Sequence, residues 1–279
     1  MATASAPSEF RFRGTGLSLK RPLVMGIVNV TPDSFSDGGR FLDPDDAVAS
    51  ARKMIAHGAD VIDVGAESTR PGATPVSFDE EWRRLEPAIG DVIALGTPVS
   101  IDTYKAEIAQ RACARGAAIV NDVWGLQHDP AMADVVAEAQ AGIIMMHNRE
   151  KADPQADIFA DIDRFFERSM EIAERANIPA ERQMLDPGIG FGKTLEQNFS
   201  IINRLEHFAR HGRALMVGAS RKRMIGAVLS VETDDRLYGS LALHTIAMMK
   251  GASMVRVHNV QPHADAARIV TATLQEGLA

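Results

Sequence analysis

The chain has 279 residues, a formal net charge of -7 at pH 7 and a hydrophobic content of 46%, which is ordinary for a soluble globular protein. The acidic balance argues against a nucleic-acid-binding protein, whose contact surface would be basic. No apolar stretch approaches the ~18 residues of a membrane span, and residues 1–9 lack the basic and apolar regions of a signal peptide. We therefore expect a cytoplasmic enzyme with no nucleic-acid partner and no membrane partner.

The chain is expected to form one domain over residues 10–279, after a disordered tail over residues 1–9. Phe10–Lys20 predicts a short hairpin that turns at Arg13–Gly16 and closes the floor of the domain. Beyond it, strand-like and helix-like patterns alternate to the end of the chain, which is typical of a parallel sheet. The strands are expected at residues 24–29, 61–65, 99–103, 118–123, 142–147, 184–187, 214–219 and 254–259, and the last helix at 263–276. Eight such units without a linker predict one α/β domain, a (β/α)8 TIM barrel.

Several helix starts carry a recognisable signal. Asp43-Pro44 and Asp129-Pro130 each predict an N-cap followed by proline at the first helical position. Ser77–Glu80 and Thr194–Gln197 fit the capping box, in which side chain and backbone bond reciprocally. Gly188–Thr194 lacks the glycine spacing of a phosphate-binding P-loop, so we interpret it as a tight turn from a strand to a helix.

Polar residues follow several of the apolar strands at the point where each strand ends, namely Asn29, Asp102, Asn121 and Asp186. A charge at the end of a buried strand costs several kcal/mol unless something pairs with it. Polar groups at many strand ends therefore indicate one shared site, as at the C-terminal face of a (β/α)8 barrel. Carboxylates and an amide together suit the amino, N–H and carbonyl edge of a pterin. Each residue taken alone would more simply cap the next helix.

The last strand places two basic side chains on one face. Arg256 and His258 are two residues apart, whereas Val255 and Val257 occupy the opposite face. Both basic groups should point into the barrel mouth, where the arginine can bind phosphate oxygens through two parallel hydrogen bonds. The alternative is an ordinary ion pair between Arg256 and a carboxylate, with a hydrogen-bonded histidine beside it.

Three polar segments follow other strands. Thr31–Gly39 and Glu67–Gly72 have the composition of loops, and each combines hydroxyl groups, charge and glycine as a phosphate-binding lid would. Two flexible surface loops are the alternative. Ser220–Arg223 is expected to open a helix whose basic N-terminus binds an anion, and a solvated basic turn is the alternative. Met146 and His147 at the end of the fifth strand are interpreted as core residues.

These segments resemble one enzyme family. Met25–Gly39, which reads Met-Gly-Ile-Val-Asn-Val-Thr-Pro-Asp-Ser-Phe-Ser-Asp-Gly-Gly, closely resembles the first signature of the dihydropteroate synthases. Ile62–Gly72, with its Glu-Ser-Thr-Arg-Pro-Gly end, resembles the second. The segments Asp186-Pro187-Gly188, Gly218–Lys222 and Arg256–His258 follow in the expected order. The resemblance covers about residues 24–260.

The resemblance implies a folate-pathway reaction. Enzymes of this family join 6-hydroxymethyl-7,8-dihydropterin pyrophosphate to p-aminobenzoate and release pyrophosphate. Catalytic roles are implied for four residues, Asp102, Asp33, Arg256 and Lys222. The implied pterin contacts are Asp102, Asn121, Asp186, Lys222, Met146 and Arg256. The implied pyrophosphate contacts are Asn29, Arg256 and His258, with Asn29 also contacting Mg2+. The implied p-aminobenzoate pocket includes Asp33, Phe35, Ser68, Thr69, Arg70 and Pro71, and Ser220 is expected to receive the carboxylate of p-aminobenzoate.

The chemistry implied by the resemblance agrees with the residues. Pyrophosphate leaves first, and Asp102 can stabilise the pterin cation that forms. Mg2+ held by one protein oxygen and by phosphate oxygens is the usual mode for this ion. An aniline nitrogen is uncharged at neutral pH, so no strong general base is required. A homodimer is expected from the resemblance alone.

Two departures from the family pattern are visible. Ala66 stands where the second signature usually has glycine, and Asn148-Arg149-Glu150 follows His147 where Met-Gln-Gly is common. Two alternatives remain at this stage. One is a pterin-binding methyltransferase domain on the same barrel, which the Ser-Thr-Arg-Pro-Gly loop and the lack of a cobalamin-binding region disfavour. The other is an inactive paralogue that binds pterin as a sensor.

Overall fold

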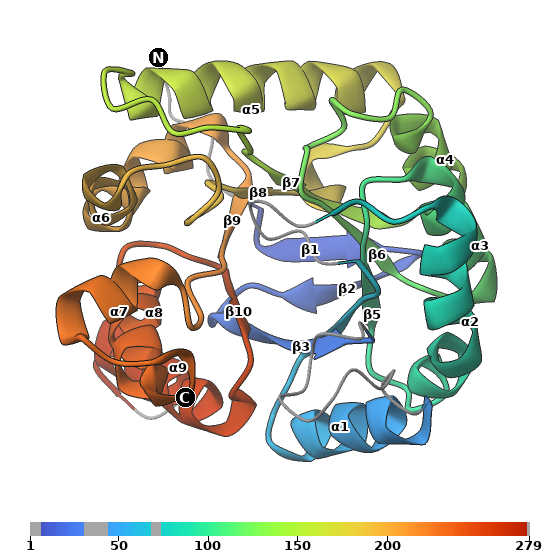
Figure 1. The fold of residues 1–279 in the computed structure, drawn as a ribbon, viewed down its shortest axis with the longest axis horizontal. Coiled ribbons are helices and arrows are strands. Elements are labelled where there is room, and N and C mark those ends of the chain that lie inside the picture. Colours follow the sequence, from blue (N-terminus) through green and yellow to red (C-terminus); the bar gives the residue numbers. More distant parts are fainter. Residues whose placement is uncertain (1–6, 31–43, 68–73, 278–279) are drawn as a thin grey trace.

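Eight parallel strands close into a barrel, and the helices lie outside it (Figure 1). The computed structural model describes residues 7–30, 44–67 and 74–277. The strands of the barrel are β3 Leu23–Asn29, β4 Val61–Gly65, β5 Val99–Asp102, β6 Ile119–Asp122, β7 Gly142–Met146, β8 Gln183–Asp186, β9 Ala214–Val217 and β10 Met254–Val257. Strand β10 pairs with β3 and closes the ring. The predicted TIM barrel is confirmed, and each expected strand occurs within two residues of its expected bounds.

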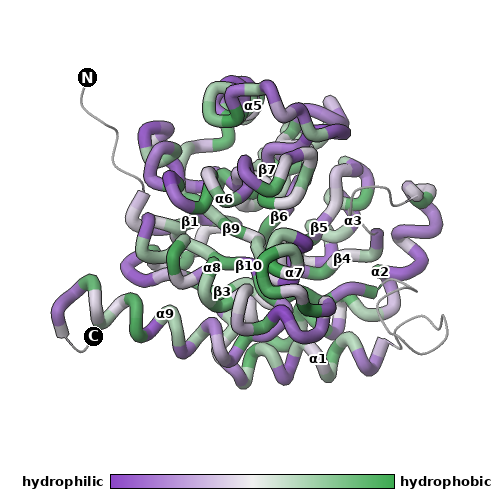
Figure 2. Tube along the Cα trace, turned by 60° about the vertical axis from the view of Figure 1, so that its left-hand side comes forward, coloured by the Kyte–Doolittle hydropathy of each residue, from purple (hydrophilic) through white to green (hydrophobic). Residues whose placement is uncertain are grey.

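The helices follow the strands in alternation. They are α1 Pro44–Ala56, α2 Phe78–Ile93, α3 Ala106–Arg115, α4 Met132–Glu138, α5 Ile158–Arg175, α6 Leu195–Asn203, α7 Arg223–Leu229, α8 Leu237–Met249 and α9 Val260–Gln275, with shorter 3-10 turns η2 Ala180–Arg182, η3 Leu205–His211 and η4 Thr233–Asp235. The strands are mostly hydrophobic, while the helices mix hydrophilic and hydrophobic residues (Figure 2). This contrast is expected when each helix packs one stripe against a buried sheet. Within the described part of the chain, no helix is long and apolar enough to cross a membrane.

The predicted hairpin closes the floor of the barrel. Strands β1 (Glu9–Phe12) and β2 (Thr15–Ser18) pair antiparallel around the turn residues Arg13 and Gly14. Phe10 and the side chain of Phe12 are buried among residues from the starts of the barrel strands. The fit is tight, because a Cβ added to Gly142 at the start of β7 would lie 2.8 Å from the Phe10 ring. Ligands can therefore enter the barrel only from the opposite end.

The observed helix starts agree only in part with those predicted from the sequence. Pro44 is the first residue of α1, while Asp43 lies outside the described residues. Thr194 forms the complete capping box with Gln197, whereas Ser77 accepts only the backbone N–H of Glu80. The prediction for Asp129-Pro130 was wrong, because α4 begins at Met132 with no side-chain cap. The last helix was predicted too short, since α9 begins at Val260.

Asp129 has a different role in the structure. Its Oδ2 accepts the backbone N–H of Ala106 at 2.9 Å, and its Oδ1 accepts that of Ala131. The carboxylate therefore satisfies an amide at the start of α3, the neighbouring helix, instead of capping the helix that follows it. The local sequence pattern carries no information on this long-range acceptor.

Candidate active site

The polar strand ends meet at the mouth of the barrel. Asp102 and Asn121 are register partners on β5 and β6, and Asp186 at the end of β8 pairs with Met146. The register leads from Asn121 through Ile144 of β7 to Met184 of β8, and Asp186 lies two positions beyond Met184. Because the strands of such a barrel tilt, this offset of two residues over two strands brings Asp186 to the height of Asn121. Asp102, Asn121 and Asp186 are all buried. Asn121 and Asp186 therefore lie at a similar height, and Asp102 beside Asn121 completes a polar layer at the barrel mouth.

Arg256 joins this layer from β10 with two short ion pairs. Its Nε donates to Asp63 Oδ2 at 2.6 Å and its terminal nitrogen to Asp102 Oδ2 at 2.6 Å. Val255 and Val257 pack on the other side of the strand against α9, as the alternation predicts. The sequence left two interpretations of Arg256 open, phosphate binding and an ion pair with a carboxylate. The contacts in the structure are those of the ion pair. The Arg256 side chain as a whole is still 21% exposed, so it can also meet a ligand.

Asp63 is a site residue that the sequence reasoning missed. It is fully buried, and besides Arg256 it accepts the side-chain N–H of Asn121 at 3.4 Å. One signal could have found it, because Asp63 is the single carboxylate inside the otherwise apolar strand β4. A charge there must have a partner inside the barrel.

Three acceptor atoms of this cluster have no hydrogen-bond partner among the described residues. They are Asp63 Oδ1, Asp102 Oδ1 and Asn121 Oδ1, all of them buried. Buried polar atoms in native proteins are almost always bonded to protein, water or ligand. Three such acceptors in one layer can therefore accept hydrogen bonds from a ligand, and the N–H-rich edge of a heterocycle supplies such donors.

Burial changes the acidity of the carboxyl groups. Burial raises the pKa of Asp102 to about 7, although Arg256 opposes this shift. Burial also raises the pKa of Asp186 to about 6, against the hydrogen bond that Gly188 N–H donates at 2.7 Å. Burial lowers the pKa of Arg256, but Asp63 and Asp102 outweigh that cost and the net shift is upward. The guanidinium is thus always charged, and Asp102 can change protonation near neutral pH.

Lys222 lies above the same layer, next to an aromatic ring. Its Nζ is 4.1 Å from the centroid of the Phe191 ring, and Phe191 packs with Met146. This arrangement suits a flat ring bound between apolar walls. Phe191 is a second residue that the sequence reasoning missed, because its Gly-Phe-Gly context indicated only a turn. Helix α7 begins at Arg223 with Lys222 as its N-cap residue, so the end of the predicted segment Ser220–Arg223 opens the helix, whereas Ser220 and Arg221 lie in the turn before it.

Ser220 and His258 contact each other. Ser220 Oγ lies 2.9 Å from His258 Nδ1, and it also accepts the His258 backbone N–H at 3.3 Å. Ser220 is buried, whereas His258 follows directly after β10 and is half-buried. The hydroxyl and the imidazole are therefore held as one polar unit beside the arginine strand.

Asn29 is the last residue of β3, half-buried at the barrel mouth. It is the register partner of Gly65. Across the described residues, no group of three His, Cys, Asp or Glu side chains could hold a metal ion. A magnesium ion at Asn29 would therefore rely on one amide oxygen and on oxygens of the ligand, which is compatible with the preference of this ion for oxygen ligands.

Comparison with known proteins identifies the family. Residues 25–258 match the family of pterin-binding enzymes. The dihydropteroate synthase of Bacillus subtilis is 45% identical over 265 residues, which cover 94% of this chain and 93% of that protein. The structure of Xanthomonas albilineans dihydropteroate synthase with 4-aminobenzoic acid is 40% identical, with a TM-score of 0.91 over 96% of this chain and 98% of the other. That of Clostridium difficile dihydropteroate synthase in the presence of pteroic acid is 45% identical, with a TM-score of 0.88 over 91% and 97%.

The chain belongs to the dihydropteroate synthase family. The resemblance seen in the sequence is confirmed, and it extends over nearly the whole length of the relatives. The methyltransferase alternative is therefore disfavoured, since these relatives, which match over nearly the whole chain, are dihydropteroate synthases.

The remaining predicted site residues are not described by the structure. Asp33, Phe35, Ser68, Thr69, Arg70 and Pro71 lie outside the described residues, so their assignments stay predictions.

The departures from the family pattern lie close to the site. Ala66 is buried directly after β4. Its carbonyl oxygen accepts an N–H of Arg84 at 3.0 Å. Arg149 lies against Gly192, where an added Cβ would be 2.3 Å from the Arg149 carbonyl oxygen. The unusual Asn148-Arg149-Glu150 segment therefore packs on the turn that carries Phe191.

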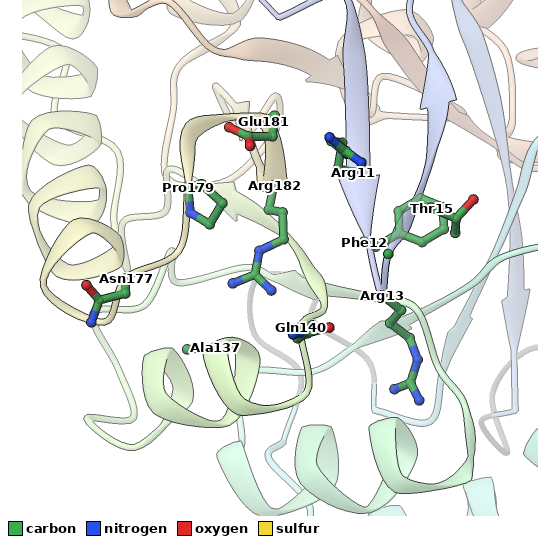
Figure 3. A pocket seen from close by; sticks show the side chains of 11 residues that line it. Arg11, Phe12, Arg13, Thr15, Ala137, Gln140, Asn177, Pro179, Glu181 and Arg182 are labelled. Atoms are coloured by element: carbon green, nitrogen blue, oxygen red, sulfur yellow. The ribbon is translucent and has the colours of Figure 1, made fainter.

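A separate cavity of about 360 Å3 opens at the hairpin end of the molecule (Figure 3). Arg11 of the hairpin and Glu181 and Arg182 of η2 line it, and none of the predicted site residues does. It lies at the opposite end of the barrel from the strand ends that carry Asp102 and Arg256. The cavity is therefore not part of the candidate active site.

Proposed function

We propose that this chain condenses 6-hydroxymethyl-7,8-dihydropterin pyrophosphate with p-aminobenzoate, giving 7,8-dihydropteroate and pyrophosphate. The observation that carries the proposal is the layer of unpaired buried acceptors on Asp63, Asp102 and Asn121. They lie beside the charged Arg256. Acceptors suit the donor edge of a dihydropterin, and the guanidinium suits its pyrophosphate. Membership in the family makes this pairing of ligand groups the expected one.

The reaction divides into two steps in this proposal. The C–O bond between the pterin methylene and pyrophosphate breaks, and both electrons leave with pyrophosphate. The amine nitrogen of p-aminobenzoate then bonds to the methylene carbon and loses a proton to solvent. Asp102 stabilises the positive charge of the intermediate pterin, because a carboxylate in a water-poor site interacts strongly with a cation. Arg256 and His258 bind the leaving group.

The other assigned residues position the substrates. Asp186 and Lys222 bind the pterin edge, Met146 packs on its ring, and Ser220 binds the carboxylate of p-aminobenzoate. Asn29 would hold Mg2+ together with pyrophosphate oxygens, and the ion would supply charge neutralisation of the leaving group. Asp33 is proposed to be a further catalytic residue. Phe35, Ser68, Thr69, Arg70 and Pro71 are proposed to form the p-aminobenzoate pocket.

We further propose that the protein acts in the cytoplasm as a homodimer. Large apolar side chains are exposed on α7 and α8, where Val228 is 64% and Tyr238 is 80% exposed. Exposed apolar residues that gather on neighbouring helices are typical of a protein interface.

One assay tests the proposed activity. Purified protein is incubated with dihydropterin pyrophosphate, p-aminobenzoate and Mg2+, each of which is also left out in turn. Dihydropteroate that forms only when all three are present supports the proposal. Tight binding of the pterin pyrophosphate without any product would instead support the inactive-paralogue alternative.

A further inference from the structure

A buried lysine closes the turn between β8 and α6. Lys193 Nζ donates to the carbonyl oxygens of Gly188 at 2.8 Å and Phe191 at 3.0 Å, and it lies 2.8 Å from His147 Nδ1. The turn depends on glycine, since Gly188, Gly190 and Gly192 all have positive φ. None of the roles assigned above uses Lys193 or His147.

The contacts determine the protonation of the pair. An ammonium group has three N–H donors and no acceptor, so at this distance His147 Nδ1 must be the unprotonated nitrogen. His147 Nε2 then carries the proton and donates to Asp161 Oδ2 at 3.2 Å. Burial and the positive charge of Lys193 lower the pKa of His147 to about 2, which keeps the ring neutral. Burial also lowers the pKa of Lys193, but the four hydrogen-bond contacts of its nitrogen among the described residues are all to acceptor atoms, which favours the ammonium form.

The turn that Lys193 closes makes three contacts with two residues of the active site, Asp186 and Lys222. Gly188 N–H donates to Asp186 Oδ1 at 2.7 Å. The ring of Phe191 lies under Lys222 Nζ at 4.1 Å. A Cβ added to Gly190 would be 3.1 Å from Lys222 Cδ. A shift of this turn would therefore move Asp186 and Lys222 together.

The other side of the turn rests on the segment after β7. A Cβ added to Gly188 would lie 2.0 Å from the His147 carbonyl oxygen. The backbones thus lie in close contact, and Lys193 bonds to both of them because it also contacts the His147 carbonyl oxygen at 3.4 Å. The lysine adds a side-chain link between the β7 and β8 ends of the barrel mouth, beside the backbone hydrogen bond from His147 N–H to the Asp186 carbonyl oxygen at 2.9 Å.

We propose that Lys193 is a positioning residue for the pterin subsite, which holds the Gly188–Gly192 turn against His147 and thereby sets the places of Asp186 and Lys222. It does not touch the substrate. The inference rests on the proposed function, because it names the pterin as the ligand that the turn serves. Residues that orient ligating groups from behind typically contribute about 10–100-fold to affinity or activity.

The first test compares Lys193→Met with Lys151→Met, a control at an exposed lysine. The Lys193→Met variant should raise the dissociation constant and the KM for the dihydropterin substrate by about 10-fold or more. The KM for p-aminobenzoate should stay within about two-fold, because residues other than the turn bind that substrate. Unchanged pterin affinity in a folded Lys193→Met protein would overturn the proposal. So would an equal loss for both substrates.

The second test uses the acceptor side of the pair and does not remove the lysine. In His147→Asn the amide oxygen takes the place of Nδ1, so pterin affinity should stay near that of the unmodified protein. In His147→Leu the acceptor is lost, and affinity should fall as in Lys193→Met. Equal affinities in the two variants would contradict a role that acts through this hydrogen bond.

A third readout does not depend on the proposed function. The 15N chemical shifts of His147 should show a neutral ring with the proton on Nε2 down to acidic pH, and the loss of that pattern in Lys193→Met. If the unmodified protein shows it but neither binds pterin nor forms product, the proposed function fails while the Lys193–His147 link stands. If the ring titrates like a free histidine, the link itself is wrong.

Discussion

At the scale of single residues, the centre of the site is one guanidinium shared by two carboxylates. Asp63 and Asp102 each bond to Arg256 at 2.6 Å, so the arginine neutralises charges that would otherwise repel each other inside the barrel. If Arg256 binds pyrophosphate as proposed, the ligand would compete with both carboxylates for the same guanidinium. Binding of the leaving group and release of the carboxylates would then be linked events.

Substitution of Arg256 should distinguish the contribution of the pyrophosphate to binding from that of the pterin ring. In Arg256→Ala, affinity for the pyrophosphate-bearing dihydropterin should fall by about 100-fold, because a charge-assisted bidentate contact is lost. Affinity for the plain 6-hydroxymethyl-dihydropterin should fall much less. Calorimetric titration with both ligands measures the difference, and Arg164→Ala on the exposed side of α5 is the control. Equal losses for both ligands would show that Arg256 supports the site only as a structural ion pair.

Asp102 should act through its charge and should not be needed for pterin binding. In Asp102→Asn the dihydropterin should still bind, while turnover falls by roughly 100-fold because the cation loses its counter-charge. Burial raises the pKa of Asp102 to about 7, so the carboxyl becomes protonated as the pH falls below that value. The kcat/KM of the unmodified protein should therefore decrease on the acidic side of neutrality, and Asp102→Asn should lack this decrease. Turnover close to that of the unmodified protein would reduce Asp102 to a structural partner of Arg256.

Substitution of the neighbouring carboxylate, Asp63, tests whether Asp102 is the group responsible for this pH dependence. The charge of Asp63 contributes to the raised pKa of Asp102. In Asp63→Asn that contribution disappears, and the acidic decrease of kcat/KM should move to lower pH. A midpoint that stays in place would mean that another group titrates.

At the scale of secondary-structure elements, the hairpin contributes stability to a barrel whose chemistry lies at the other end. Phe10 is fully buried, and large-to-small substitutions of buried aromatic residues cost about 3–5 kcal/mol. In Phe10→Ala the free energy of unfolding should fall by that amount, while the KM for the dihydropterin substrate stays the same below the unfolding transition. Urea unfolding and steady-state kinetics measure the two quantities. A change in KM without a loss of stability would contradict the role of the hairpin as a floor.

The elements also show what the sequence can predict and what it cannot. The eight strands and the polar groups Asn29, Asp102, Asn121 and Asp186 at their ends are predictable, because an apolar run and the residue that stops it are neighbours in the chain. Asp63 can be recognised as a carboxylate inside an apolar strand, but its partner cannot be identified locally, since Arg256 is 193 residues away.

Other predictions were wrong or incomplete because the bonding partner is distant in the sequence. Asp129 looks like the cap of the helix that follows it, but it bonds instead to an amide of α3, 23 residues before it. Lys193 reads as the end of a turn, and only the fold brings His147 to its ammonium group. Local capping signals and strand periodicity are reliable where the bonding partner is local. Partners that the barrel closure supplies have no local signal.

At the scale of the whole molecule, the exposed apolar side chains of α7 and α8 predict self-association. The chain has a mass of 30.2 kDa, so sedimentation equilibrium should give a mass twice that value. Leu229 on α7 is 48% exposed, and Leu229→Asp would place a charge in the interface at little cost to the free monomer. We expect this variant to sediment as a monomer with the helices intact by circular dichroism. A dimer that survives the substitution would place the interface elsewhere.

The closed floor of the barrel has a consequence for the order in which ligands enter and leave the site. With Phe10 and Phe12 sealing one end, the space above Asp102 and Asn121 has a single entrance. Whatever lies deepest must arrive before any molecule that covers it, and it can leave only after that molecule has gone. An excess of the outer molecule would therefore slow the exchange of the inner one by blocking the passage, without touching any group that binds it.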